Sequence, residues 1–237
     1  GLPFSITLLL ILLTHEMSHY FMSRKHHVSV TLPYFIPAPS IIGTFGAIIK
    51  MRPPIPDRRS LIDIGAAGPL GGFIVAVVAV MIGLTYSDIK SAKEIQEGLS
   101  LGSSILFYIL SKIVLNVDPD KYEIVLHPIA FAGWIGFLVT SLNLLPIGQL
   151  DGGHIIYALL GEKHQRVSKW IIPILIVLGI LFWSGWVIWA FLMLILGYKH
   201  PPVVYPEIPL DGKRKFIGWI CFVIFILTFT AVPIKGK

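Results

Sequence analysis

Long apolar runs separated by short polar segments dominate this chain of 237 residues. A helix needs about 20 predominantly apolar residues to cross the hydrocarbon core of a bilayer. We therefore predict membrane-spanning helices at residues 2–22, 61–86, 128–145, 170–196 and 216–232. The run 102–117 is marginal in length and predicts an interfacial or re-entrant helix on the outer side. The pattern as a whole predicts an all-α polytopic membrane protein, a bundle of about five to six transmembrane helices.

The longest of these runs, 170–196, contains a break at Ser184-Gly185. Dividing it there leaves about 13 residues on each side, which is too few for two crossings of a core about 30 Å thick. The sequence therefore favours a single tilted span, with a broken helix as the alternative.

Composition agrees with a membrane protein. The chain is 55% hydrophobic and 14% charged, whereas soluble domains carry about 25% charged residues. The net charge of +6 comes from Lys and Arg in short loops between apolar runs, which indicates cytoplasmic loops and anionic lipid headgroups rather than nucleic acid. The basic cluster at 24–27 predicts that the first helix ends on the cytoplasmic side.

The first apolar run contains His15, Glu16 and His19 in an H-E-x-x-H pattern. Residues four apart lie on one face of a helix, so the two histidines can bind one metal ion. Glu16 lies beside that face and is a candidate general base for a metal-bound water. Ionisable groups at membrane depth are costly and usually functional.

A catalytic zinc usually has three protein ligands and an open position. The candidates for the third ligand are Asp151, His154, His127, His200 and the acids of the polar loops. Asp151 is favoured, because it follows the span that returns to the cytoplasmic side. The adjoining Gly152 and Gly153 also allow close backbone approach. The alternative is that Asp151 only caps a short helix at 155–160.

Several neighbouring residues have two interpretations. Asn143 can donate to a developing oxyanion or hold a substrate carbonyl, or it can satisfy carbonyls freed near Pro146. His154 reads as a packing residue, and three further histidines read as ordinary interfacial residues: His127, His164 and His200. His26 and His27 read as a solvated basic flank. The small residues at 65–72 predict close helix packing and no chemical role.

The segment 28–60 is rich in proline, which excludes a continuous helix. Within it, residues 41–52 are mostly β-branched or small, which predicts one or two short strands rather than a buried linker. Non-helical backbone at membrane depth is tolerated only against protein or a water-filled cavity. A re-entrant β segment beside the metal site fits that condition, and a strand there can hold an extended substrate by main-chain pairing.

H-E-x-x-H at His15 to His19, together with N-x-x-P-x-x-x-x-D-G from Asn143 to Gly152, resembles the site-2 protease family of intramembrane zinc metalloproteases. The resemblance covers about residues 5–160. It extends to Gly43-Thr44-Phe45-Gly46, which is similar to the family's re-entrant β segment, and to Ala67-Gly68-Pro69.

The resemblance implies one catalytic zinc ion bound by His15, His19 and Asp151. It implies that Glu16 activates the water and that Asn143 assists. The expected substrate is a single-span membrane protein, cut near the cytoplasmic face. Its cleaved segment is expected to pair with Gly43, Thr44, Phe45, Gly46, Ala47 and Ile48.

We expect a catalytic transmembrane core at 1–160 and C-terminal transmembrane helices at 161–237. The protein is expected to be integral to the bilayer and multi-pass. A prokaryotic cell membrane is favoured and a plastid membrane is the alternative. No nucleic-acid partner is expected, and the oligomeric state is not predicted. Because residue 1 is glycine, the sequence is expected to be a processed chain or a fragment.

Three other functions are compatible with parts of the pattern. A metal or proton transporter also places His, Glu and Asp in a membrane, but repeated halves are not evident. A non-catalytic homologue that binds membrane helices would normally lack Glu16 or a ligand. A prenyl-protein type zinc protease needs a glutamate ligand on a later helix, where only Glu162 and Glu207 occur, both in loops.

Overall fold

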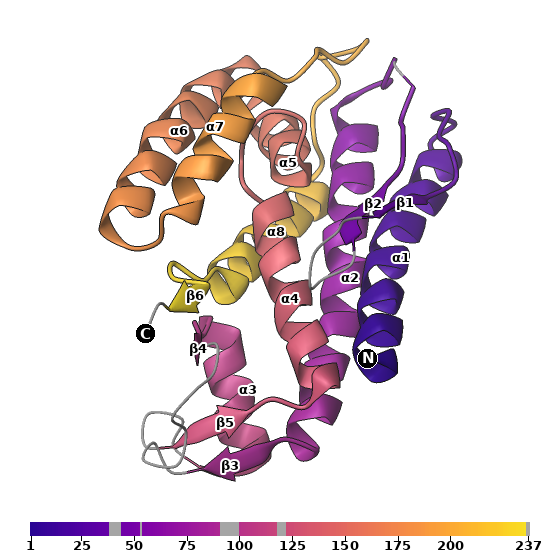
Figure 1. Cartoon of the computed structure of the whole chain (residues 1–237). Coiled ribbons are helices and arrows are strands. Elements are labelled where there is room, and N and C mark those ends of the chain that lie inside the picture. Colours follow the sequence, from indigo (N-terminus) through magenta and orange to yellow (C-terminus); the bar gives the residue numbers. More distant parts are fainter. Residues whose placement is uncertain (38–43, 53, 91–99, 118–121, 236–237) are drawn as a thin grey trace.

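The computed structural model of the chain describes residues 1–37, 44–52, 54–90, 100–117 and 122–235. Within these ranges the fold is mostly helical, as predicted (Figure 1). The helices are α1 (Leu2–Lys25), α2 (Arg58–Thr85), α3 (Ile105–Leu115), α4 (Pro128–Asn143), α5 (Asp151–Leu160), α6 (His164–Leu181), α7 (Gly185–Leu196) and α8 (Gly212–Thr228), with a short 3-10 turn at Gly161–Lys163.

Helices α1, α2 and α4 pack side by side along their lengths (Figure 1). Small residues let the backbones approach closely, as in other membrane helix pairs. A Cβ added at Gly133 of α4 would lie 2.9 Å from the backbone nitrogen of Val80 in α2. One added at Gly136 would lie 2.9 Å from the Cβ of Ala76. The apolar core of this three-helix unit lies between these faces.

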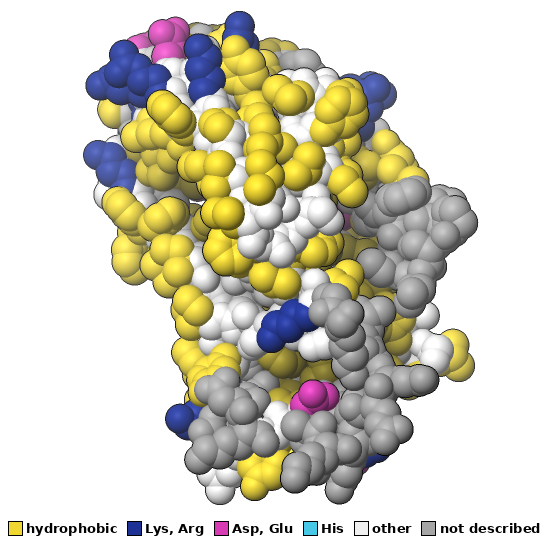
Figure 2. Space-filling model, turned by 60° about the vertical axis from the view of Figure 1, so that its left-hand side comes forward, with side chains coloured by type: hydrophobic (Ala, Val, Ile, Leu, Met, Phe, Trp, Pro, Cys, Tyr) yellow, Lys and Arg dark blue, Asp and Glu magenta, His cyan; other side chains and the backbone are white. Residues whose placement is uncertain are grey.

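Three segments are long and apolar enough to cross a membrane, judged by length and composition: Leu2–Lys25, Arg58–Thr85 and Asp151–Leu181. Helices α3, α4 and α7 are apolar but shorter. These are the helices of a multi-pass membrane protein. Hydrophobic side chains cover much of the upper part of the face seen in Figure 2, and several Lys and Arg side chains lie along its top edge.

The prediction of one tilted span at 170–196 is wrong. The chain reverses direction after Leu181, so that α6 and α7 pack against each other as a helical hairpin (Figure 1). Gly179 makes this contact possible, since a Cβ there would lie 2.4 Å from Cγ2 of Val187. The length argument counted apolar residues only. Helix α6 begins in the polar segment, at His164, and so gains a further turn and a half.

Two strands, β1 (Tyr34–Pro37) and β2 (Thr44–Ile48), form an antiparallel pair beside α1 (Figure 1). The predicted strand is therefore present at 44–48, while Gly43 lies outside the described residues. Gly46 has a φ of +111°, a conformation that favours glycine. Two smaller antiparallel pairs join β3 (Asp88–Lys90) to β5 (Glu123–Val125) and β4 (Ser100–Leu101) to β6 (Ile234–Lys235).

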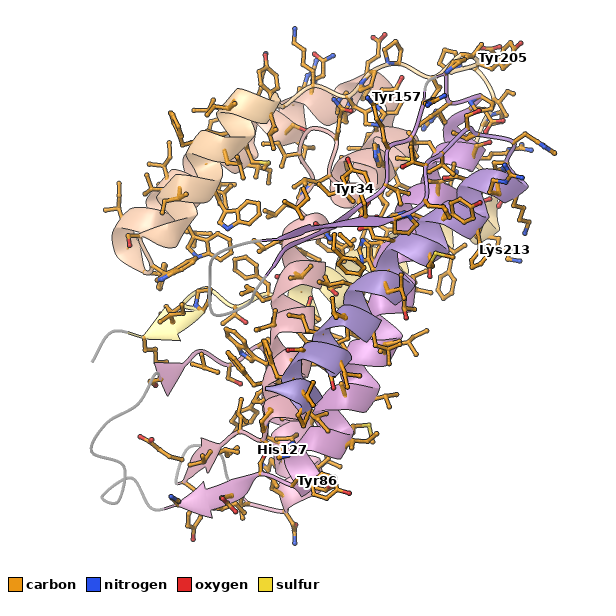
Figure 3. The ribbon with its side chains drawn as sticks, turned by 45° about the vertical axis from the view of Figure 1, so that its right-hand side comes forward. Tyr34, Tyr86, His127, Tyr157, Tyr205 and Lys213 are labelled. Atoms are coloured by element: carbon orange, nitrogen blue, oxygen red, sulfur yellow. The ribbon has the colours of Figure 1, made fainter. Side chains whose placement is uncertain are left out.

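The elongated molecule has two distinct ends. Tyr86 and His127 lie at one end, while Tyr157 and Tyr205 lie at the other (Figure 3). His127 caps α4 by accepting a hydrogen bond from the backbone nitrogen of Ile129 at 3.3 Å. It therefore lies far from the end that carries α5.

Ionic contacts near the amino end of α2 tie several helices together. The carboxylate of Asp63 accepts hydrogen bonds from Nε and Nη2 of Arg214 in α8, at 3.0 and 2.6 Å. Nε2 of His26 lies 3.0 Å from the same carboxylate, so the prediction that His26 is solvated is wrong. The Arg58 side chain donates to the carbonyl oxygens of Ala158 and Leu159, at the carboxyl end of α5.

Candidate metal centre

His15 and His19 lie one turn apart on the buried face of α1. The two residues are 5% and 4% exposed, and their Nε2 atoms are 3.2 Å apart. This short distance shows that the helical spacing predicted from H-E-x-x-H brings both ring nitrogens to one point. Two neutral imidazoles cannot direct lone pairs at each other at that distance unless a proton or a cation lies between them.

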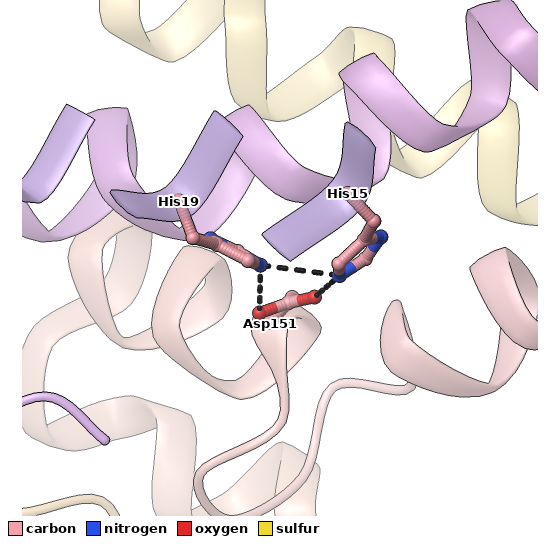
Figure 4. Close-up of side chains that lie close together, drawn as sticks. All are labelled: His15, His19 and Asp151. Atoms are coloured by element: carbon pink, nitrogen blue, oxygen red, sulfur yellow. Dashed lines mark hydrogen bonds and ion pairs between the residues drawn. The ribbon is translucent and has the colours of Figure 1, made fainter. Parts of the chain in front are cut away.

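Asp151, the first residue of α5, meets this pair from the opposite side (Figure 4). Its Oδ2 lies 3.1 Å from Nε2 of His15, and its Oδ1 lies 3.1 Å from Nε2 of His19. One donor atom from each residue falls within 4.8 Å of the others. Among the described residues, no other group of His, Cys, Asp or Glu meets this criterion.

The donor set fits a catalytic divalent metal. Two imidazoles and one carboxylate match the three protein ligands that leave a zinc ion with one open position. All three side chains are mostly buried, so an ion bound here would be shielded from bulk solvent. The carboxylate would also offset part of the ion's charge in this apolar setting.

The turn that carries Asp151 depends on glycine. Gly148 has a φ of +58°. A Cβ added at Gly152 would lie 2.1 Å from the carbonyl oxygen of Leu144, and one at Gly153 would lie 2.3 Å from that of Gly148. The alternative that Asp151 caps the helix is wrong, because the cap position belongs to Leu150. The predicted helix 155–160 also begins earlier, at Asp151.

A row of glycines on α2 makes room for the two histidine rings. A Cβ added at Gly68 would lie 2.0 Å from Nε2 of His19, and one at Gly72 would lie 3.1 Å from Cβ of His15. The sequence predicted close packing at these glycines but not their contact with the two histidines. The equal spacing could have indicated this contact, because Gly68 and Gly72 are four residues apart, like His15 and His19, and pair with them in an antiparallel register.

The orientation of His19 is set by α2. Its Nδ1 lies 2.7 Å from the carbonyl oxygen of Ile64, which directs the ring's Nε2 toward Asp151. Pro69 lies in the same part of α2 and has no N–H to donate to the carbonyl of Gly65. A hydrogen bond to the far nitrogen of a metal-binding histidine fixes its tautomer and its ring plane.

Glu16 and Asn143 lie beside the three ligand candidates. The Glu16 carboxylate is half-buried and interacts with the backbone amide of Ile49, directly after β2. Asn143 is the last residue of α4, and its Nδ2 lies 3.5 Å from Nε2 of His15. The structure thus brings both predicted residues, and the end of the β segment, to the same place.

Of the predicted β segment, Ala47 is half-buried and Ile48 is exposed. The backbone of Thr44 and Phe45 continues β2, and Gly46 lies at its centre. The antiparallel partner β1 pairs Tyr34 with Ile48 and Phe35 with Ala47.

Three histidines form a buried cluster behind Asp151, so the prediction that His164 and His200 are interfacial is wrong. His154 Nδ1 lies 2.6 Å from Nε2 of His200, and the backbone nitrogen of His200 donates to Nε2 of His164 at 3.3 Å. Tyr157 stacks on His200 with ring centroids 4.6 Å apart. Burial, assisted by the neighbouring His154, lowers the pKa of His200 to about 3. The cluster therefore holds α5 through a neutral His200.

Comparison with known proteins decides the family. Residues 3–183 match the sequence model of Peptidase family M50. The chain belongs to peptidase family M50, the site-2 proteases. The resemblance predicted from the two motifs is confirmed. The M50 match includes His15, His19, Asn143 and Asp151.

Plant relatives align with different shares of this chain. It is 33% identical over 167 residues to the "Probable zinc metalloprotease EGY1, chloroplastic" of Arabidopsis thaliana, covering 69% of this chain and 30% of that protein. It is 27% identical over 234 residues to the corresponding EGY2 protein of the same plant, covering 98% of this chain and 42% of that protein. The EGY3 protein of Oryza sativa subsp. japonica is 26% identical over 245 residues, covering 96% and 41%.

The chain thus spans between 30% and 42% of the length of these M50 relatives. No solved structure matches it significantly.

Proposed function

We propose that this protein is an intramembrane zinc metalloprotease that hydrolyses peptide bonds of transmembrane helices near the cytoplasmic face. The observation that carries the proposal is the convergence of His15, His19 and Asp151 within an apolar helical bundle, with Glu16 beside them. Membership of family M50 and the zinc metalloprotease names of the relatives support it. A transporter or a non-catalytic homologue is not favoured.

Nε2 of His15, Nε2 of His19 and the carboxylate of Asp151 would hold one zinc ion. Bound there, zinc supplies Lewis acidity that makes a water molecule acidic near neutral pH and polarises the scissile carbonyl. His19 donates a hydrogen bond from Nδ1 to the carbonyl oxygen of Ile64, and close packing against Gly68 and Gly72 keeps the two rings in place. The site is therefore preorganised by α2 rather than by α1 alone.

Glu16 is the general base of this proposal. Its carboxylate takes the proton of the attacking water and passes it to the departing amine nitrogen. The backbone amide of Ile49 holds that carboxylate at the end of β2. Asn143 donates a hydrogen bond from Nδ2 to the carbonyl oxygen of the substrate as negative charge develops on it.

A transmembrane helix hides its carbonyls in its own hydrogen bonds, so the substrate must be extended before cleavage. We propose that the segment from Gly43 to Ile48 pairs with the unwound substrate. The position of Ile49 against Glu16 supports this role, because it places the end of β2 beside the general base. The partner would be a single-span membrane protein.

We further propose that residues 1–160 form the catalytic part and that residues 161–237 add the C-terminal helices. His15, His19 and Asp151 all lie in the first part. A bundle of about five to six crossings with a membrane re-entrant β segment remains our proposal for the topology. The sequence favours a prokaryotic cell membrane, but the relatives named above are chloroplastic, so the plastid alternative has the better support.

The decisive experiment measures bound zinc and cleavage of a single-span peptide by the purified protein in lipid nanodiscs. We expect Glu16→Gln to retain one zinc per chain and to lose about 10²- to 10⁴-fold in cleavage rate, the usual contribution of general base catalysis. Glu162→Gln, an exposed glutamate of the 3-10 turn, is the matched control and is expected to cleave normally. Normal cleavage by Glu16→Gln would overturn the mechanism.

Asp151→Ala tests the third ligand separately. We expect it to lose zinc while keeping its helical circular dichroism, and Asp88→Ala, in an exposed strand, to keep zinc. Stoichiometric zinc in Asp151→Ala would assign the third position to another residue.

A further inference from the structure

A cavity of about 430 Å³ lies between α5 and α8, outside the candidate metal centre. Its walls include Ile155, Ile156 and Leu159 of α5, and Trp219, Cys221 and Phe225 of α8. The volume falls in the range of about 300–1,000 Å³ that is usual for small-molecule sites. Of the described residues that line the cavity, Lys215 alone carries a charge.

Two neighbouring cations in the first turn of α8 have different surroundings. Arg214 is neutralised by Asp63 and Asp211. Lys215 is exposed and lines the apolar cavity, and among the described residues no carboxylate lies within ion-pair distance of its ammonium group. An apolar cavity with one unpaired cation at its edge is complementary to an amphiphile with an anionic headgroup.

The length of the cavity and its single charge favour a lipid chain. Lys215 and Phe225 are separated by ten residues of α8, about 15 Å at the rise of an α-helix, which is half of a hydrocarbon core about 30 Å thick. One acyl chain of a bilayer leaflet spans that half, and the one unpaired cation at the edge of the cavity matches one anionic headgroup.

We propose that the cavity between α5 and α8 binds an anionic phospholipid of the surrounding bilayer. One acyl chain lies along Trp219 and Cys221 toward Phe225, and the phosphate lies against the ammonium group of Lys215. A lysine at the end of a membrane helix reaches the headgroup level in this way while its stem covers apolar surface.

The lipid site lies directly behind the catalytic turn. Gly152 and Leu144 line the cavity, and they adjoin Asp151 and Asn143 in sequence. A bound chain would therefore contact the turn that carries Asp151, a consequence that rests on the proposed function. Binding itself can be measured without any cleavage assay, so the two proposals can fail independently.

Trp219 provides the measurement. The protein, purified in a neutral detergent, is titrated with phosphatidylglycerol or phosphatidylcholine that carry the same brominated acyl chains, and quenching of tryptophan fluorescence is recorded. We expect saturable quenching with phosphatidylglycerol binding about fivefold more tightly, the effect of one basic residue near an anionic headgroup. Trp219→Phe is expected to remove the saturable part of the quenching and to leave the non-saturable quenching of exposed tryptophans outside the cavity, such as Trp170.

Two variants separate the headgroup from the chain. Lys215→Gln is expected to abolish the preference for phosphatidylglycerol, while Lys213→Gln, exposed and outside the cavity lining, is expected to keep it. Ile156→Phe fills the cavity and is expected to weaken binding of both lipids. Equal affinity for the two lipids in the wild type, or a preference that survives Lys215→Gln, would overturn the proposal. Displacement of the quencher by a transmembrane peptide would assign the cavity to a protein helix and overturn it too.

Discussion

The apolar residues of α2 and those of the segment that leads into α6 face different surroundings. In the most apolar 18-residue stretch of α2, 44% of the residues are buried inside the molecule, against 17% in the stretch taken from Asp151–Leu181. The hairpin α6–α7 presents large side chains outward, such as Ile180 at 74% and Ile188 at 71% exposure. Helix α2 presents glycines to its neighbours instead.

This difference shows that the apolar residues of two helices can have different structural roles. In the hairpin, we expect hydrophobicity to serve contact with lipid, so that the identity of each outward residue matters little. In α2, the absence of side chains defines the space in which His15 and His19 lie. Substitutions in the two regions should therefore have effects of different size and kind.

The largest effect is expected for Gly68→Ala. The new Cβ would lie 2.0 Å from Nε2 of His19, so the ring must leave its position. We expect zinc affinity to fall by about 100-fold or more, at or beyond the upper end for disturbed outer contacts of metal ligands, with cleavage falling in parallel. Competition with a zinc chelator measures the affinity.

Gly212→Ala is the matched control, because nothing lies within 4 Å of a Cβ at that position. Unchanged zinc affinity in Gly68→Ala would mean that α2 can shift to make room for the new side chain, and that glycine at this position is not needed for zinc binding.

A smaller effect of another kind is expected in the hairpin. Gly179→Val places a side chain against Val187, whose backbone nitrogen would lie 2.8 Å from the new Cβ. We expect a loss of about 1–3 kcal/mol in the free energy of unfolding, as for other overpacked sites, with zinc affinity unchanged. Thermal unfolding and chelator competition report the two quantities. Ile180→Val, at the adjacent exposed position, should change neither, and loss of zinc in Gly179→Val would break the distinction between the regions.

The histidine cluster behind α5 predicts a pH dependence of stability. The pKa of His200 is lowered to about 3 by burial, whereas an unfolded histidine titrates near 6.5. Below about pH 6.5 only the unfolded state takes up this proton, so stability is complete above that pH and falls as the pH drops toward 3.

At pH 5.5 the expected loss from His200 is about 1 kcal/mol. His200→Gln removes this contribution, so its melting temperature should depend less steeply on pH between 7.5 and 5.5 than that of the wild type. Identical slopes in the two proteins would show that folded His200 titrates like an unfolded histidine, and that burial does not lower its pKa.

The smallest effect is expected on the outer face of α7. Ile188→Val removes one methylene from a side chain that is 71% exposed, and we expect less than about 0.5 kcal/mol. Trp186→Phe, two residues earlier, removes a buried indole that donates to the carbonyl of Ala231 at 2.7 Å. It should cost about 1 kcal/mol or more. Comparable melting temperatures for the two variants would contradict the lipid-facing assignment.

Much of this arrangement follows from local sequence. Helical periodicity alone places His15 and His19 on one face, and the flexibility of Gly152 and Gly153 makes Asp151 the best candidate to meet them. Apolar run length predicts α1, α2, α4 and α8 to within a few residues. The roles of the ligand candidates, Glu16 and Asn143 stay predictions that the proposed experiments test.

Other features depend on contacts between distant segments. The sequence shows that Gly68 is small, but whether a helix backbone or a histidine ring occupies the space depends on the register of α1 against α2. His200 borders a proline-rich loop, and its sequence position predicts an interfacial residue. The loop instead folds back onto α5, so that His200 is buried against His154. The length of the apolar run did not predict the reversal between α6 and α7, because α6 begins in the polar sequence before that run.

The distance along the chain between the ligand candidates has a consequence for biosynthesis. His15 and Asp151 are 136 positions apart, so the two histidines enter the bilayer long before the carboxylate is translated. A partly made chain offers a metal only two ligands and cannot yet form the complete donor set. The order of synthesis itself would thus delay hydrolytic competence until α1, α2, α4 and the start of α5 have all been assembled.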